Sequence, residues 1–186
     1  MSAHLANAVE VDDIQGLVRF GYRKLTQASF LLMRVRDAAS ARAWLAGCTV
    51  GSAKEQSPPP RQVPHVAISC PGLRALGMRE SVIQGFSREF VAGMSSDESR
   101  SRRLGDLGAN ARDQWQWGGR PDSVPHVLLM LYAGPGELDA WQVQVLGECA
   151  SGFELMACLD TSDMDGVEPF GFVDGISQPR LDWQRR

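Results

Sequence analysis

The densest pattern that could carry chemistry is the run Gly171-Phe172-Val173-Asp174-Gly175, near the end of the sequence. Two glycines flank one carboxylate, and glycine permits a tight turn and a close approach of the backbone to a ligand. The apolar neighbours could hold this carboxyl group in an apolar pocket. Burial raises the pKa of a carboxyl group, so such a site would exchange protons near neutral pH. A turn aspartate that hydrogen-bonds its own backbone would give the same local pattern.

The cysteines and histidines show no spacing that is typical of a metal site. The cysteines form no C-x-x-C pair and have no histidine at zinc-ligand spacing, and the three histidines lie far apart. We therefore predict no metal-ligand set within this sequence. Buried thiols in a reducing compartment are the expected state of Cys48, Cys70, Cys149 and Cys158.

Composition narrows the class of protein. The 186 residues are 44% hydrophobic and 22% charged, which is typical of a globular domain. The net charge of −3 gives no basic surplus, so we expect no binding to nucleic acid. No apolar run approaches the ~20 residues of a membrane span, and the first residues do not resemble a secretory signal. A cytoplasmic protein without a membrane partner is the expectation.

Apolar periodicity and turn residues place the elements that must position Asp174. Besides an entry strand over 12–22, the order is strand, helix, strand, insertion, strand, helix, strand. This order predicts an α+β, ferredoxin-like fold: an antiparallel sheet with helices packed on one face. The strands are expected at 28–36, 63–69, 124–133 and 153–160, the helices at 38–47 and 138–149, and the insertion as helices at 71–76 and 81–94 followed by a long irregular segment at 95–123.

The run GFVDGISQP resembles the G-x-x-D-G motif of the dye-decolorizing (DyP-type) haem peroxidases. Further segments resemble the same family in the same order, and the resemblance extends from about Asp12 to Pro179. It implies the N-terminal half of a DyP-type peroxidase, the ferredoxin-like half of the DyP and chlorite-dismutase-like fold. Residues 1–160 would be that domain, and residues 161–186 the motif segment and the start of a C-terminal domain. The further segments are DDIQGLVRFGY, ARAWL, GLRALGM, GFSREFVAGM, RRLGDLGAN and VPHVLLMLYA.

The resemblance also implies roles for residues. Asp174 would be the distal acid–base residue that moves the proton of hydrogen peroxide, and Gly175, Ile176 and Ser177 would approach the haem b edge with it. Electrons would come from dyes or phenolic donors. The family's axial histidine and distal arginine lie in the second half, so the axial ligand is expected outside this chain, and His65 and His126 are interpreted as structural. Candidate relays for oxidising equivalents are Trp115, Trp117, Trp141, Tyr132 and Trp183.

A truncated chain of this kind would be inactive without the missing half. We expect an exposed apolar patch on the sheet or near residues 164–183, covered by that half or by self-association. A non-catalytic ferredoxin-like module for dimerisation or binding is the alternative, because the iron ligand is missing. A cofactor-free enzyme of the same fold also stays open, since fold does not fix function.

Overall fold

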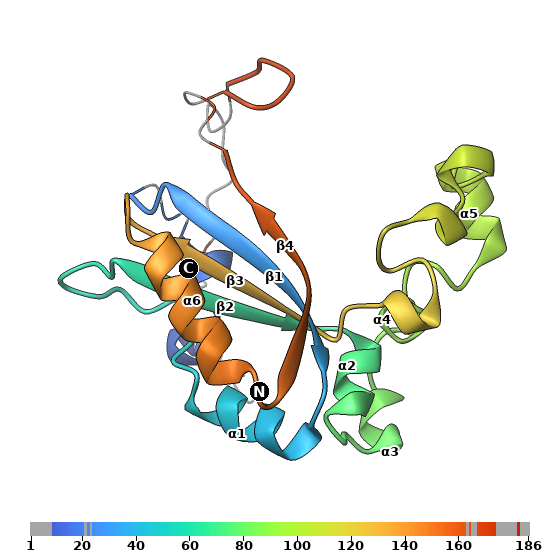
Figure 1. The fold of residues 1–186 in the computed structure, drawn as a ribbon, viewed down its shortest axis with the longest axis horizontal. Coiled ribbons are helices and arrows are strands. Elements are labelled where there is room, and N and C mark those ends of the chain that lie inside the picture. The colour runs from blue at the N-terminus through green and yellow to red at the C-terminus, as the bar shows by residue number, and fades with distance from the viewer. Residues whose placement is uncertain are drawn as a thin grey trace, which may run out of the picture.

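The central element is an antiparallel sheet with strand order β2-β3-β1-β4 (Figure 1). The computed structural model describes residues 9–20, 22, 24–162, 164, 167–173 and 182. Within them the strands are β1 (Gln27–Val35), β2 (Gln62–Ile68), β3 (Val127–Ala133) and β4 (Phe153–Asp160). All three strand pairings are antiparallel. β1 and β3 are the central strands, and helical crossovers lead from β1 to β2 and from β3 to β4, which confirms the ferredoxin-like prediction.

Two helices, α1 (Ala38–Gly47) and α6 (Leu138–Cys149), cover one face of this sheet (Figure 1). Alternate residues of β3 are buried, as the period of two in a strand requires when one face meets the core. The core between sheet and helices contains Leu31, Met33, Val127, Leu129, Leu131, Val145, Cys149 and Phe153. The helical spacing predicted over 138–149 therefore places Leu138, Val145 and Cys149 in the core.

Two local features fix the start of α1. Asp37 Oδ1 accepts a hydrogen bond from the Ser40 backbone N–H at 2.8 Å and so caps α1. That bond also lowers the pKa of Asp37. At the same end of α1, the Gly152 carbonyl accepts the Asp37 N–H at 3.2 Å, and a Cβ atom on Gly152 would lie 2.5 Å from the Ala41 backbone nitrogen. Glycine at 152 thus lets the α6–β4 turn pack directly on the backbone of α1.

Short helices form an arm between β2 and β3, to one side of the sheet (Figure 1). The single helix predicted over 81–94 is wrong, because the chain turns at Gly85 and Ser87 starts a new helix by accepting the Phe90 N–H. The segment predicted as irregular, 95–123, contains one α-helix and three 3₁₀ turns. The helices of the arm are α2 (Cys70–Ala75), α3 (Glu80–Ile83), α4 (Arg88–Ala92) and α5 (Glu98–Leu104).

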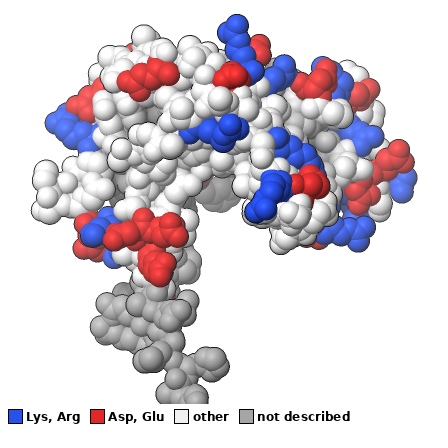
Figure 2. Space-filling model, turned by 90° about the horizontal axis from the view of Figure 1, so that it is seen from below, with Lys and Arg blue, Asp and Glu red and all other residues white. Residues whose placement is uncertain are grey.

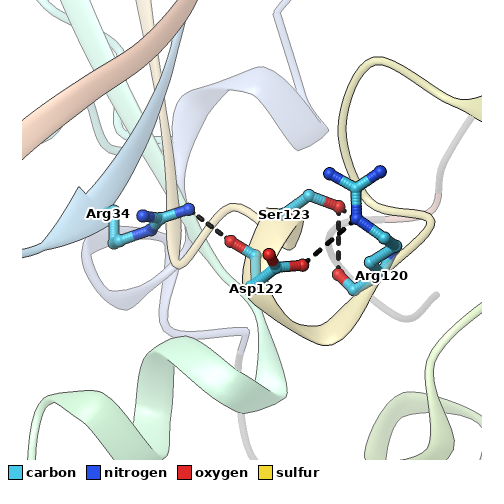
Figure 3. Close-up of polar contacts among 4 residues, drawn as sticks. All are labelled: Arg34, Arg120, Asp122 and Ser123. Carbon is cyan, nitrogen blue, oxygen red and sulfur yellow. Dashed lines mark hydrogen bonds and ion pairs between the residues drawn. The ribbon is translucent and has the colours of Figure 1, made fainter.

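A compact polar turn returns the arm to the sheet (Figure 3). The Arg34 guanidinium, on β1, donates a hydrogen bond to the backbone carbonyl of Asp122. Ser123 Oγ accepts the Arg120 N–H and donates to the Arg120 carbonyl, both at 3.0 Å. Arg120 Nε also lies 3.4 Å from Asp122 Oδ1. The start of β3 is therefore held against β1 by side chains as well as by the strand ladder.

The entry strand predicted over 12–22 is also wrong within the residues described. The chain forms 3₁₀ turns at Val11–Asp13 and Gly16–Val18. A side chain replaces the expected backbone ladder: Gln15 Nε2 donates to the Val66 carbonyl at 2.7 Å, and Gln15 Oε1 accepts the Val66 N–H at 2.9 Å. The segment is thereby fastened to β2, and in place of a strand ladder Gln15 forms one isolated antiparallel bridge with Ser52.

Charges of both signs are interspersed in the view of Figure 2, as expected from the nearly balanced composition. In the part of the chain that the structure covers, no helix is long and apolar enough to cross a membrane. The thiols differ from the expectation at one position, because Cys158 is exposed on β4, whereas Cys70 and Cys149 are buried and Cys48 is half-buried.

Candidate functional site

The G-x-x-D-G segment follows the edge strand β4. Thr161 fixes the exit from the sheet, because its Oγ1 accepts the Ala28 N–H and donates to the Ala28 carbonyl, each at 3.1 Å. Further on, a tight turn closes as the Glu168 N–H donates to the Phe172 carbonyl at 2.7 Å. Gly171 lies within this turn at φ +80°, a left-handed conformation that favours glycine. The first glycine of the motif therefore has a conformational role.

The apolar side chains before Asp174 are open to solvent. Phe170 is 88% exposed and Phe172 74% exposed, and Val173 is exposed as well. This confirms, for the described part of the segment, the predicted exposed apolar patch near residues 164–183. Asp174 itself, with Gly175, Ile176 and Ser177, lies outside the described residues. Its role, the apolar pocket around it and the domain division at residue 160 stay predictions.

The contacts of the two described histidines bear on whether either could bind a haem iron, which needs an unoccupied ring nitrogen. His65 is fully buried and has a partner at both ring nitrogens: Gln15 Oε1 at Nδ1 and Tyr22 Oη at Nε2. His126 Nδ1 accepts the Val35 N–H at 3.1 Å. Burial lowers the pKa of both imidazoles, and the nearby Arg34 adds to the effect at His126. These contacts support the structural interpretation of both residues.

The described residues would fit haem as a covering face and not as its anchor. The exposed rings of Phe170 and Phe172 offer the apolar surface that a flat macrocycle requires. Among the residues described, no group of three or more His, Cys, Asp or Glu side chains could hold a metal ion. The exposed rings of this part of the chain are therefore compatible with an apolar contact to haem.

The candidate relay residues are not grouped together. Trp141 packs against the core, Trp117 lies exposed in the arm, and Trp115 Nε1 donates to the Asn110 carbonyl at 3.0 Å. Trp183 lies outside the described residues. Tyr132 is the exception, because its ring belongs to an aromatic cluster on the sheet with Tyr22, Phe30 and His65. Sequence reasoning missed Tyr22, whose contacts with His65 and Tyr132 join residues that are distant in sequence.

Strand order β2-β3-β1-β4 with α1 and α6 on one face defines an α+β protein of the ferredoxin-like class. No family model matches the chain. A dye-decolorizing peroxidase of Exidia glandulosa is 26% identical over 185 residues, covering 94% of this chain and 35% of the relative. Dye-decolorizing peroxidase msp1 of Mycetinis scorodonius is 28% identical over 191 residues, and the match covers 97% of this chain and 36% of that relative.

Among solved structures, a dye-decolorizing peroxidase in complex with 2,6-dimethoxyphenol has a TM-score of 0.69 at 24% identity. The match covers 92% of this chain and 39% of that one. The chain thus spans little more than a third of the proteins that it matches. Sequence and structure together confirm the predicted resemblance of this chain to part of a DyP-type peroxidase.

Proposed function

We propose that this chain forms the distal side of a DyP-type haem peroxidase site, with Asp174 as its acid–base residue. The observation that carries the proposal is the G-x-x-D-G segment with exposed apolar rings beside it, in a chain that aligns along 94% of its length with a dye-decolorizing peroxidase. The axial ligand comes from a complementary segment, in the same polypeptide or in another one. Haem supplies, when bound, the iron that holds the peroxide.

The chain's own part is proton transfer and shielding. Asp174 takes a proton from the peroxide and returns it to the departing oxygen, so that water leaves instead of hydroxide. Gly175 lets the backbone approach the haem edge, because it has no side chain. Phe170 and Phe172, which are exposed in the isolated chain, become covered by haem and the complementary segment. Phenolic donors like the one bound by the structural relative would then be oxidised in one-electron steps.

Haem titration tests the proposal directly. The chain is titrated with haem alone, and then with the complementary segment of a dye-decolorizing peroxidase added. A Soret shift that requires both components supports a composite site. No shift under either condition contradicts the proposal and leaves the alternative, a non-catalytic dimerisation or binding module.

In the complete assembly, Asp174→Asn tests the acid–base role. We expect slower peroxide cleavage in stopped flow and nearly unchanged haem content. Asp139→Asn is the matched control, because it makes the same chemical change at an exposed position of α6. Gly175→Val should instead lower haem uptake by crowding the approach. An unchanged cleavage rate in Asp174→Asn would contradict the assigned role.

A further inference from the structure

Three side chains form a hydrogen-bonded chain on the sheet face opposite α1 and α6. Tyr22 Oη lies 3.1 Å from His65 Nε2, and His65 Nδ1 lies 3.2 Å from Gln15 Oε1. His65 is on β2 opposite Met130 of β3, so it points away from the helical core, yet it is fully buried under the entry segment. The Gln15 end of this arrangement holds the entry segment on β2, but the proposed peroxide chemistry uses neither Tyr22 nor His65.

The direction of each hydrogen bond follows from the backbone of β2. The Gln15 amide bonds both the N–H and the carbonyl of Val66, and only one orientation of the amide allows this. Gln15 Oε1 is therefore an acceptor, so His65 Nδ1 must carry the proton and donate it. His65 Nε2 is left with its lone pair, and it accepts the hydroxyl proton of Tyr22.

The ionisation states agree with this assignment. Burial lowers the pKa of His65, so the imidazole is neutral at pH 7 and can accept a proton. Burial, together with the nearby Tyr132, raises the pKa of Tyr22, so the phenol keeps its proton in the resting state. The arrangement is a phenol hydrogen-bonded to a neutral base that is shielded from water.

The backbone is shaped around the Tyr22 hydroxyl. A Cβ atom on Gly16 would lie 2.1 Å from it, and one on Gly51 would lie 2.3 Å from the Val63 side chain and 3.4 Å from the hydroxyl. Tyr22 itself has φ +44°, a left-handed conformation that costs free energy for a bulky residue. Two glycines and a strained backbone thus hold one hydroxyl against one imidazole.

Tyr22 also has a second aromatic ring beside it and access to solvent. The Tyr22 and Tyr132 ring centroids are 5.6 Å apart. On its other side Tyr22 lines an open cavity of about 570 Å³, together with Phe20, Gly51 and Pro64. A small reductant in this cavity would reach the ring directly, and Tyr132 would continue a path across the sheet.

We propose that Tyr22 is a redox-active tyrosine with His65 as its proton acceptor. An outer-sphere metal-complex oxidant takes one electron from the phenol; the O–H bond breaks and its proton forms an N–H bond at His65 Nε2. The products are a neutral tyrosyl radical, the reduced metal complex and an imidazolium, which donates to Gln15 Oε1. A phenolic donor in the cavity gives one electron to the radical, and the proton returns from His65 Nε2 to the phenolate oxygen. The site is additional to the proposed peroxide site.

Photo-oxidation of the full chain tests this proposal without haem. Flash-generated tris(bipyridine)ruthenium(III) is the oxidant, and high-field EPR is the readout. Ring-deuterated tyrosine separates tyrosyl signals from those of the five tryptophans. The chain has only two tyrosines, so Tyr132→Phe and Tyr22→Phe are matched variants that each leave one. A phenoxyl oxygen that accepts a hydrogen bond from imidazolium gives a lowered g1 value.

The expected result is a tyrosyl signal with a lowered g1 value in wild type and in Tyr132→Phe, and loss of that signal in Tyr22→Phe. His65→Gln should reduce the radical yield several-fold and raise g1. Absence of the signal in Tyr132→Phe would overturn the proposal, as would an unchanged g1 value in folded His65→Gln. A structural role alone predicts neither spectroscopic change. Because no haem is added, failure here is separate from failure of the peroxidase proposal.

Discussion

Nδ1 of His126 accepts a hydrogen bond from the backbone N–H of Val35 at 3.1 Å. The β1–β3 ladder ends at the pair Met33 and Val127. Directly beyond it, the backbone N–H of His126 donates to the Met33 carbonyl at 2.8 Å. The imidazole therefore takes the place that a further strand carbonyl would occupy. A histidine that could be mistaken for a metal ligand instead extends the sheet by one hydrogen bond.

His126→Ala should lower the free energy of unfolding by about 1–3 kcal/mol, because the half-buried N–H of Val35 loses its acceptor. Urea denaturation measures the change. His126→Asn is the control, since its amide oxygen is a shorter replacement acceptor, and it should lose less stability. Equal stability of the alanine variant and wild type would contradict a role for this bond.

Replacement of two helical glycines by alanine should change the stability of the protein in opposite directions. A Cβ atom on Gly72 of α2 would lie 2.0 Å from the His126 carbonyl oxygen, so Gly72→Ala must push α2 away from β3. A Cβ atom on Gly147 of α6 would meet nothing within 4 Å. Gly147→Ala should therefore stabilise the protein by about 0.5–1 kcal/mol through helix propensity.

Thermal unfolding of both variants checks this pair. Gly72→Ala should unfold at a lower temperature than wild type by several degrees, since about 1 kcal/mol corresponds to roughly 2–8 °C for domains of this size range. Gly147→Ala should unfold at a higher temperature. Stabilisation of both variants would mean that α2 does not approach the strand as closely as described.

The elements around the core were predictable because their signals are local. The Asp37 cap, the continuous apolar run of β3 and the helical spacing in α6 each involve neighbours in sequence. In the sequence of β4, Phe153, Leu155, Ala157 and Leu159 fall at every second position, which predicts a strand with one apolar face, but this alternation does not hold in the second half of the strand. The register shifts between Leu32 and Met33, which pair with Ala157 and Leu155, so Met156 is an extra residue and the faces exchange beyond it.

The Tyr22–His65–Gln15 arrangement could not be predicted, since its members are separated by 43 and 50 residues in sequence. The entry segment looked strand-like because its apolar residues approach a period of two, but a side-chain amide made the contact with β2 instead. Gly16 and Gly51 are the signal that the sequence offers, but their role follows only from the structure, where a Cβ atom at either position would approach the Tyr22 hydroxyl.

His65 should make stability depend on pH in a defined window. Burial holds its pKa below the value of the unfolded chain, about 6.5. Above that pH neither state binds the proton, so stability is flat. As the pH falls below about 6.5, the unfolded state takes up a proton that the native state excludes, and stability falls by at most about 1.4 kcal/mol per pH unit. His126, whose pKa is also lowered, adds to the slope.

Urea denaturation between pH 8 and pH 5 measures this slope. Carboxylates with lowered pKa values, such as Glu80 at about 2, contribute only below about pH 4.5 and stay outside the window. His65→Gln removes one of the titrating groups, so its stability should be lower overall but less dependent on pH. An identical slope in wild type and variant would show that His65 is not held neutral.

The exposed rings of Phe170 and Phe172 should drive self-association of the isolated chain. They leave apolar surface in the segment that follows the edge strand β4, and burying such rings against a second copy is favourable at roughly 25 cal/mol per Å². Phe170→Ser with Phe172→Ser should therefore shift sedimentation towards monomer and reduce the binding of an apolar dye. Val143→Ser is the matched control, because Val143 is 72% exposed but lies alone on α6. If the control and the double variant sediment alike, the surface of Phe170 and Phe172 has no role in association. In the composite assembly, where we propose that haem covers these two rings, the double variant should instead lower haem retention.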